Sequence, residues 1–184
     1  MAKIDALIAN GSEEVECLAV VDVLRRAGAE VRLISAEAGR EVTTSHGVQL
    51  LCDDTVSACA FSDADVLFLP GGMPGTERLW ACGKLKEALK QQATAGKRIA
   101  AICAAPSVLG RLGLLEGKKA TCYPGFEQML LGAEYVRDGV VTDGNITTAR
   151  GLGYALDLGL ELVRLLYGEE ESLSLKAKIQ YDQV

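Results

Sequence analysis

Two kinds of hydrophobic pattern alternate along the chain. Short runs of consecutive apolar residues predict buried strands at 4–9, 30–36, 65–69 and 98–102. Stretches with apolar residues at helical spacing predict helices from Ser12 to about Ala27 and at 85–95, 106–112 and 153–166. Ser12 is expected to cap the first helix, and Gly28 to end it.

More polar segments interrupt this alternation at two places and predict hairpins. The first spans 40–52, with Ser45-His46-Gly47 in its middle, and the second joins 136–141 to 146–149 around Asp143-Gly144-Asn145. The tail from Glu169 is expected to be helical and then to fray. No low-complexity linker divides the chain, so residues 1–184 are predicted to form a single domain.

Short apolar strands alternating with helices favour an α/β fold: a doubly wound, mostly parallel sheet with helices on both faces, to which the hairpins are added. Ligands of such folds bind beyond the carboxyl ends of the strands. Three segments should therefore meet there: Asn10-Gly11-Ser12, Pro70-Gly71-Gly72 and Cys103.

Charge and cysteine content narrow the possible partners. The net charge of −6 argues against nucleic acid or an anionic membrane as the main partner. No apolar run approaches the roughly 18 residues of a membrane span, and the N-terminus lacks a signal-peptide pattern. The six cysteines show no C-x-x-C spacing and the chain has one histidine, so we expect free thiols, no metal and a cytoplasmic location.

Cys103 carries the most informative local pattern. It follows the apolar run 99–102 and precedes Pro106 and a helical stretch, which indicates a strand, one sharp turn and a helix. Ala101 and Ala105 are small enough for such a turn, and the following helix should favour the thiolate. The alternative is a buried cysteine that only fills space.

The other candidates each have a structural alternative. Gly71 and Gly72 could form an oxyanion hole with the N–H of Ala104, or simply a tight turn. One carboxyl among Glu13, Glu14 and Glu16 could share a proton with the thiol, although acidic residues also favour any helix start.

Three polar residues elsewhere in the chain are weaker candidates. Tyr123 could hydrogen-bond near the site or pack against Pro124. Arg150 could bind a carboxylate or phosphate, or pair with an acid at the surface. His46 is the one possible Cys–His partner, although a solvated histidine is the ordinary expectation in a polar hairpin.

Four segments together resemble the ThiJ/PfpI superfamily, in particular the branch of the human Parkinsonism-associated deglycase and its bacterial relatives. They are residues 10–16 (NGSEEVE), 69–72 (LPGG), 100–104 (AAICA) and 149–151 (ARG). The resemblance implies a flavodoxin-like sandwich that forms a homodimer. It also implies that Cys103 is the nucleophile, that Glu16 is a protonated carboxyl touching it, and that the N–H groups of Gly72 and Ala104 contact the substrate oxygen.

The resemblance further implies a glutathione-independent glyoxalase or deglycase that acts on small 2-oxoaldehydes such as methylglyoxal without a cofactor. The alternatives are an oxidative-stress sensor or holdase chaperone using the same cysteine, or a role in thiazole and thiamine biosynthesis. Tyr123 stands where the human-type pattern has a histidine, so peptidase activity is not expected. The dimer is expected to form around the first helix and first hairpin, through Val15, Leu18 and Cys52.

Overall fold

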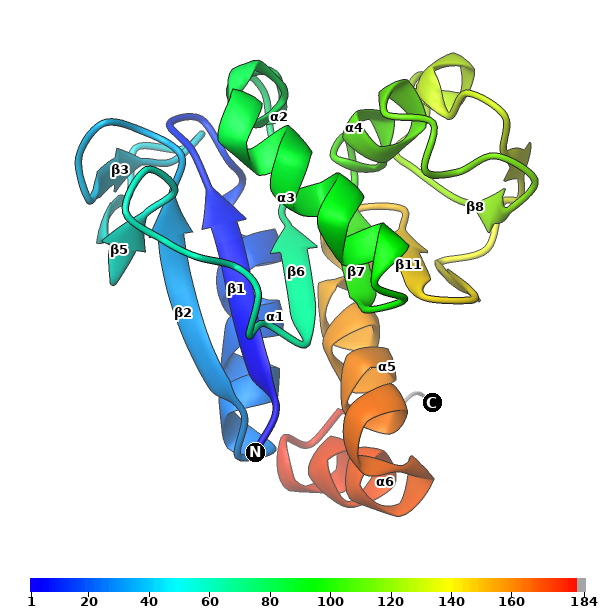
Figure 1. The fold of residues 1–184 in the computed structure, drawn as a ribbon. Coiled ribbons are helices and arrows are strands. Elements are labelled where there is room, and N and C mark those ends of the chain that lie inside the picture. The colour runs from blue at the N-terminus through cyan, green and yellow to red at the C-terminus, as the bar shows by residue number, and fades with distance from the viewer. Residues whose placement is uncertain (182–184) are drawn as a thin grey trace.

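A seven-stranded sheet forms the centre of the protein. The computed structural model describes residues 1–181, and the strand order in the sheet is β10-β11-β7-β6-β1-β2-β5 (Figure 1). All neighbours run parallel except β10, which pairs antiparallel with β11. The strands are β1 (Lys3–Ile8), β2 (Glu30–Ser35), β5 (Asp54–Thr55), β6 (Val66–Leu69), β7 (Arg98–Ile102), β10 (Val140–Asp143) and β11 (Ile146–Ala149).

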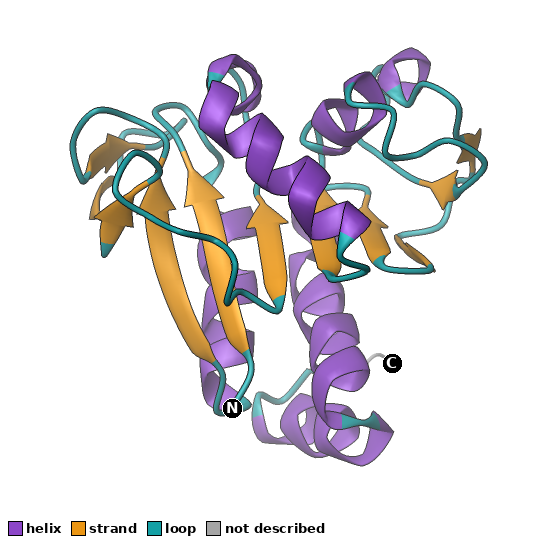
Figure 2. Ribbon diagram, viewed as in Figure 1, coloured by secondary structure: helices purple, strands orange, loops and turns teal. Residues whose placement is uncertain are grey.

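Helices cover both faces of this sheet, because its central strands are apolar on both sides (Figure 2). Along β1, Ile4, Ala6 and Ile8 belong to one core cluster, whereas Leu7 belongs to the other. The first cluster packs under α1 (Glu14–Arg26), α5 (Ala155–Tyr167) and α6 (Glu169–Lys178). The second packs under α2 (Gly75–Ala81), α3 (Gly83–Thr94) and α4 (Pro106–Arg111). The predicted doubly wound α/β fold is therefore confirmed.

The start of α1 differs from the prediction. Glu13, and not Ser12, is the N-cap, and its carboxylate accepts a hydrogen bond from the Glu16 N–H at 2.6 Å. The Ser12 hydroxyl is engaged elsewhere, since it accepts a hydrogen bond from the Ala9 N–H at 3.1 Å. The serine therefore closes the turn after β1, and the cap of the helix lies one residue later than expected.

The first predicted hairpin is present, and the second is shifted. Strands β3 (Glu41–Thr43) and β4 (Gln49–Leu51) pair antiparallel within the predicted 40–52 segment. In the second hairpin, β10 begins at Val140, because Val136 is engaged elsewhere: its N–H donates to the Ala120 carbonyl at 2.9 Å. Val136 thereby extends a small parallel sheet of β8 (Lys119–Ala120) and β9 (Glu134–Tyr135).

The remaining helices differ from the prediction in detail. The sequence also indicates a helical segment after Gly72 without fixing its bounds, and this segment is α2. Two short 3₁₀ helices occur at Glu127–Met129 and Leu152–Tyr154, so α5 begins at Ala155 and not at Gly153. The tail is helical through α6, and any fraying at 182–184 lies outside the described residues. Within residues 1–181, no helix is both long enough and apolar enough to cross a membrane.

Candidate active site

Cys103 lies at the sharp turn between β7 and α4, as the sequence predicts. Its φ of 65° places a non-glycine residue in the left-handed region, which is uncommon and concentrates at functional sites. Its N–H donates to the Ala149 carbonyl of β11 at 2.9 Å, and Pro106 occupies the first turn of α4. The flanking Ala101 and Ala105 are fully buried, in keeping with the small residues that such a turn needs.

Glu16 is the carboxyl that reaches the thiol. It is almost fully buried in the first turn of α1, and it shares a hydrogen bond with Cys103. Its Oε2 accepts a hydrogen bond from the Gly71 N–H at 3.0 Å, and the Leu152 N–H also donates to the carboxyl. The other two candidates are engaged elsewhere, because Glu13 caps the helix and Glu14 lies 3.1 Å from the His46 Nδ1. The geometry therefore selects Glu16.

The ionisation of the thiol and the carboxyl is coupled. Burial raises the pKa of Glu16 from 4.5 to about 7. Burial and the negative charge of Glu16 raise the pKa of Cys103 to about 12, whereas the N–H groups of Gly72 and Ala104 favour the thiolate. The pair therefore loses its first proton near pH 7 and holds the second strongly, because two adjacent negative charges repel each other.

This coupling corrects the expectation of a thiol that ionises readily by itself. The helix that follows Cys103 has only six residues, so its dipole is weak, and the sulfur is largely removed from water. A thiolate forms at neutral pH only as one arrangement of the shared charge, with the proton on Glu16 and the charge on Cys103.

The glycines at the end of β6 are required by close packing. A Cβ built on Gly71 would lie 2.6 Å from the Cys103 Cβ and 2.7 Å from Glu16 Oε2. A Cβ on Gly72, whose φ is 86°, would lie 2.4 Å from the Glu13 nitrogen. The Gly71 N–H is bonded to Glu16, whereas those of Gly72 and Ala104 are directed at the Cys103 sulfur. All three N–H groups were predicted to bind substrate, but only those of Gly72 and Ala104 lie beside the reacting sulfur.

Tyr123 and Arg150 lie on one side of this pair. The Tyr123 N–H donates to the Cys103 carbonyl at 2.8 Å, while about half of its side chain is exposed. Both residues line a hollow of about 360 Å³ formed with Pro124 and the 151–154 segment. Its wall adjoins the thiol–carboxyl pair, because a Cβ on Gly151 would lie 3.9 Å from Glu16 Oε1.

His46 lies away from the thiol. Its ring is 71% exposed and contacts the Ser45 hydroxyl and the Glu14 carboxylate, each at 3.1 Å. Within residues 1–181, no hydrogen bond connects it with Cys103. Together with Glu13 and Glu14, His46 forms a group whose ligand atoms lie within 4.8 Å of one another, which is the arrangement a metal ion would need. The contacts among these side chains already explain why they lie close together, since Glu13 caps α1 and Glu14 pairs with His46.

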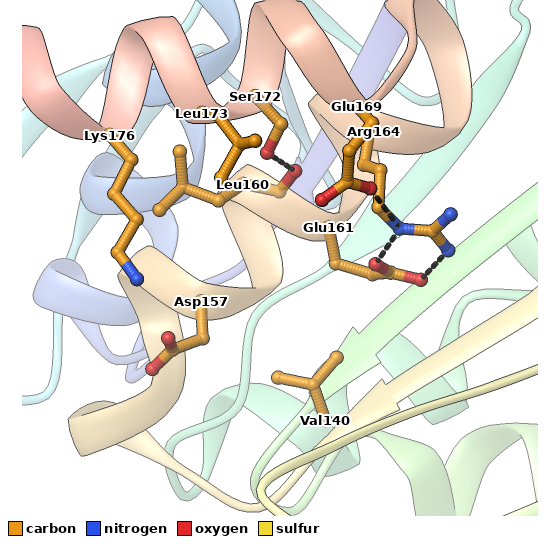
Figure 3. A pocket seen from close by; sticks show the side chains of 9 residues that line it. All are labelled: Val140, Asp157, Leu160, Glu161, Arg164, Glu169, Ser172, Leu173 and Lys176. Carbon is orange, nitrogen blue, oxygen red and sulfur yellow. Dashed lines mark hydrogen bonds and ion pairs between the residues drawn. The ribbon is translucent and has the colours of Figure 1, made fainter. Parts of the chain in front are cut away.

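Another hollow, of about 340 Å³, lies between α5, α6 and β10 (Figure 3). Figure 1 places α6 at the end of the sheet opposite the carboxyl ends of β1 and β6. The Arg164 guanidinium in this hollow is already neutralised, since it binds Glu161 at 2.7 Å and also lies 3.9 Å from Glu169. This hollow therefore has no part in the chemistry of Cys103.

Two contacts of the site are not evident from the sequence. Leu152 donates its N–H to Glu16, and Gly151 brings the Tyr123 ring and the carboxyl together. The one sequence signal is the Arg150-Gly151 pair ahead of the last long helix, and it points to a role for the arginine alone.

Comparison with known proteins identifies relatives over most of the chain. The profile of the DJ-1/PfpI family matches residues 2–165. Protein DJ-1 homolog B of Arabidopsis thaliana is 41% identical over 174 residues, which are 94% of this chain and 40% of that protein. The chain thus spans less than half the length of this relative. A Caenorhabditis elegans protein named glutathione-independent glyoxalase DJR-1.2 is 32% identical over 89% of this chain and 88% of its own length.

Solved structures agree with the sequence comparison. The structure titled as oxidised Toxoplasma gondii DJ-1 has a TM-score of 0.96 and 37% identity, and the match covers all of both chains. At this similarity the two chains share the fold described above, including the mostly parallel sheet that places Cys103, Glu16 and the glycine pair at one edge.

Proposed function

The chain belongs to the DJ-1/PfpI family, and from this premise we propose that it is a cysteine-dependent, glutathione-independent glyoxalase of small 2-oxoaldehydes such as methylglyoxal. The observation that carries the proposal is the buried Cys103–Glu16 pair, in which a nucleophile and a proton carrier share one negative charge near neutral pH. One relative carries this activity in its name.

The first step uses the arrangement with the charge on sulfur. The Cys103 thiolate adds to the aldehyde carbon, a carbon–sulfur bond forms, and the electron pair of the carbonyl moves to its oxygen. The N–H groups of Gly72 and Ala104, which point at the sulfur, lie near the position of this oxygen and stabilise its charge. Protonated Glu16 then gives its proton to the oxygen, which leaves a hemithioacetal beside a carboxylate.

The second step uses that carboxylate as the base. Glu16 removes the proton from the former aldehyde carbon and returns it to the neighbouring carbonyl carbon, while the hydroxyl proton moves to the neighbouring oxygen. The product is a thioester of a 2-hydroxyacid. Water then cleaves the carbon–sulfur bond, which releases the 2-hydroxyacid and restores the thiol. The net reaction adds one water to the 2-oxoaldehyde, and each proton transfer uses Glu16, water or the substrate's own oxygens.

The test is lactate release from methylglyoxal in the absence of glutathione. We expect turnover by the wild-type protein and a loss of at least about a thousandfold in kcat/KM for Cys103→Ser, as for other catalytic nucleophiles. Cys82→Ser is the matched control, since Cys82 is the other cysteine of the six that is not fully buried. Wild-type activity in Cys103→Ser would refute the nucleophile, and a wild-type protein that releases no lactate would refute the function.

A second candidate is a sensor of oxidants, in which Cys103 becomes a sulfinate that accepts a hydrogen bond from protonated Glu16. Two observations favour it: Cys103 is partly accessible whereas four of the other cysteines are buried, and the Toxoplasma gondii relative is titled as oxidised. The holdase and thiazole roles stay predictions, as does the cytoplasmic location.

The protein is further proposed to act as a homodimer through the region of α1 and the first hairpin. Val15 on α1 is 47% exposed, and Leu51 on β4 is 67% exposed, so this region offers apolar side chains that a second copy of the chain could cover. Cys52 must be removed from the expected interface, because it is fully buried beneath the chain's own residues. Leu18 is partly buried against the core cluster of α1 and remains a candidate.

A further inference from the structure

Arg150 has an unsatisfied donor in the interior of the protein. Its Nε is buried and has no hydrogen-bond partner, and among residues 1–181 no ion pair includes this arginine. A guanidinium carries five N–H donors and stays charged at all ordinary pH values. Leaving such a donor buried without a partner destabilises the folded chain. The residue as a whole is only half-buried, so part of Arg150 is open to solvent. A guanidinium that has no acceptor within the described chain therefore points to a ligand that supplies one.

The surroundings of Arg150 are those of a small binding site. Arg150 lines the hollow of about 360 Å³ together with Tyr123, Leu152 and Tyr154, which give it a largely apolar wall. A few polar groups in an apolar hollow are the usual means of orienting a small molecule. Of the described residues that line this hollow, Arg150 is the one that carries a charge.

The hollow is directly connected with the proposed chemistry. Arg150 follows Ala149, whose carbonyl accepts the Cys103 N–H at 2.9 Å. Leu152, in the wall of the hollow, donates its N–H to Glu16. A substrate whose reacting carbon lies at Cys103 would thus extend its substituent along Tyr123 and Gly151 toward the guanidinium.

We propose that this hollow receives the substituent of the 2-oxoaldehyde and that Arg150 binds an oxyanionic group, a carboxylate or a phosphate, at its end. The inference rests on the proposed glyoxalase function and specifies its substrate class: anionic 2-oxoaldehydes are preferred over methylglyoxal. The overall charge of −6 gives the protein no general attraction for anions, so the preference depends on this one cation. Arginine is suited to the task, because its planar fork matches both carboxylate and phosphate.

The experiment compares kcat/KM for three 2-oxoaldehydes: methylglyoxal, 4,5-dioxopentanoate, which carries a carboxylate, and the phosphate ester of hydroxypyruvaldehyde. We expect the wild type to favour one or both anionic substrates. In Arg150→Gln the ratio of anionic to neutral kcat/KM should fall by about tenfold to a hundredfold, the usual worth of a charge-assisted hydrogen bond. Arg150→Lys should restore part of the ratio. The matched control is Arg137→Gln, an exposed arginine in the loop before β10, which should keep the wild-type ratio.

The two anionic substrates show whether Arg150 prefers a carboxylate or a phosphate. The preferred group is the one whose kcat/KM ratio to methylglyoxal falls more in Arg150→Gln. An unchanged ratio in Arg150→Gln would overturn the inference. A fall in dimer stability with an unchanged ratio would also overturn it, because a second copy of the chain would then be the occupant of the hollow.

A binding measurement tests this inference independently of the proposed function. Levulinate and inorganic phosphate carry the anionic groups without a reactive aldehyde, and their binding is measured by calorimetry with the same variants. If the wild type turns over no 2-oxoaldehyde, the glyoxalase function fails. Weaker binding of either anion to Arg150→Gln than to the wild type would still support an oxyanion site, whereas equal binding would refute it.

Discussion

Glu16 should make the stability of the protein depend on pH, and its replacement by glutamine should remove that dependence. Burial raises the pKa of Glu16 from 4.5 to about 7 in the folded state, so the folded chain keeps a proton that the unfolded chain releases. Between these two pH values the unfolded state binds fewer protons, and the free energy of unfolding therefore falls as the pH rises. A tenfold change in proton affinity is worth about 1.4 kcal/mol, so the total loss is about 3 kcal/mol, complete just above pH 7.

Glu16→Gln keeps the shape of the side chain and an oxygen that can accept the Gly71 N–H, but it cannot ionise. We expect it to be more stable than the wild type at pH 8, with a difference about 3 kcal/mol larger than at pH 4.5. The measurement is urea unfolding at half-unit steps across this range. Glu87→Gln, on the exposed side of α3, removes the same group at the surface and should keep the wild-type slope. Parallel curves for the wild type and Glu16→Gln would refute the assignment of a buried, protonated carboxyl.

Three further outcomes are expected. Gly71→Ala should lose about 1–3 kcal/mol of stability, the usual range for an overpacked core, because the added Cβ would collide with Cys103. It should also lose most lactate release. Gly83→Ala should lose neither, because no atom lies within 4 Å of the Cβ that it adds. Graded peroxide should oxidise Cys103 first and stop at the sulfinate, and peptide masses showing even oxidation of all six cysteines would contradict this. Light scattering should report about twice the chain mass of 19.5 kDa, and a monomer would contradict the dimer.

Most of the fold could be predicted because its strongest signals are local. A continuous apolar run such as 98–102 is typical of a strand that is buried on both faces of a parallel sheet, and the structure places it there. One error occurs where a distant partner decides the structure, since Val136 pairs with Ala120, which is far from it in sequence. The other error is local: the Ser12 hydroxyl accepts the Ala9 N–H of its own turn, and this bond competes with capping of α1.

The site was predictable in part for the same reason. The elbow at Cys103 has a local pattern of small residues, whereas the choice among three glutamates depends on which one the first turn of α1 directs at the sheet edge. The resemblance to the family selected Glu16, and the residues alone did not. The ionisation of the thiol was predicted wrongly because burial and a neighbouring charge are properties of the folded chain, and they outweigh the short helix that follows.

Three locally unfavourable features occur together at this edge of the sheet. They are the left-handed backbone of Cys103, the buried carboxyl of Glu16 and the buried, unpartnered Nε of Arg150. Each destabilises the folded chain on its own, and a bound substrate can relieve the last two: the carboxyl transfers its proton, and the guanidinium gains an acceptor. A ligand that relieves both binds the folded state alone and stabilises it. An anionic 2-oxoaldehyde should therefore raise the Tm of the wild type more than methylglyoxal does, and Arg150→Gln should reduce that difference.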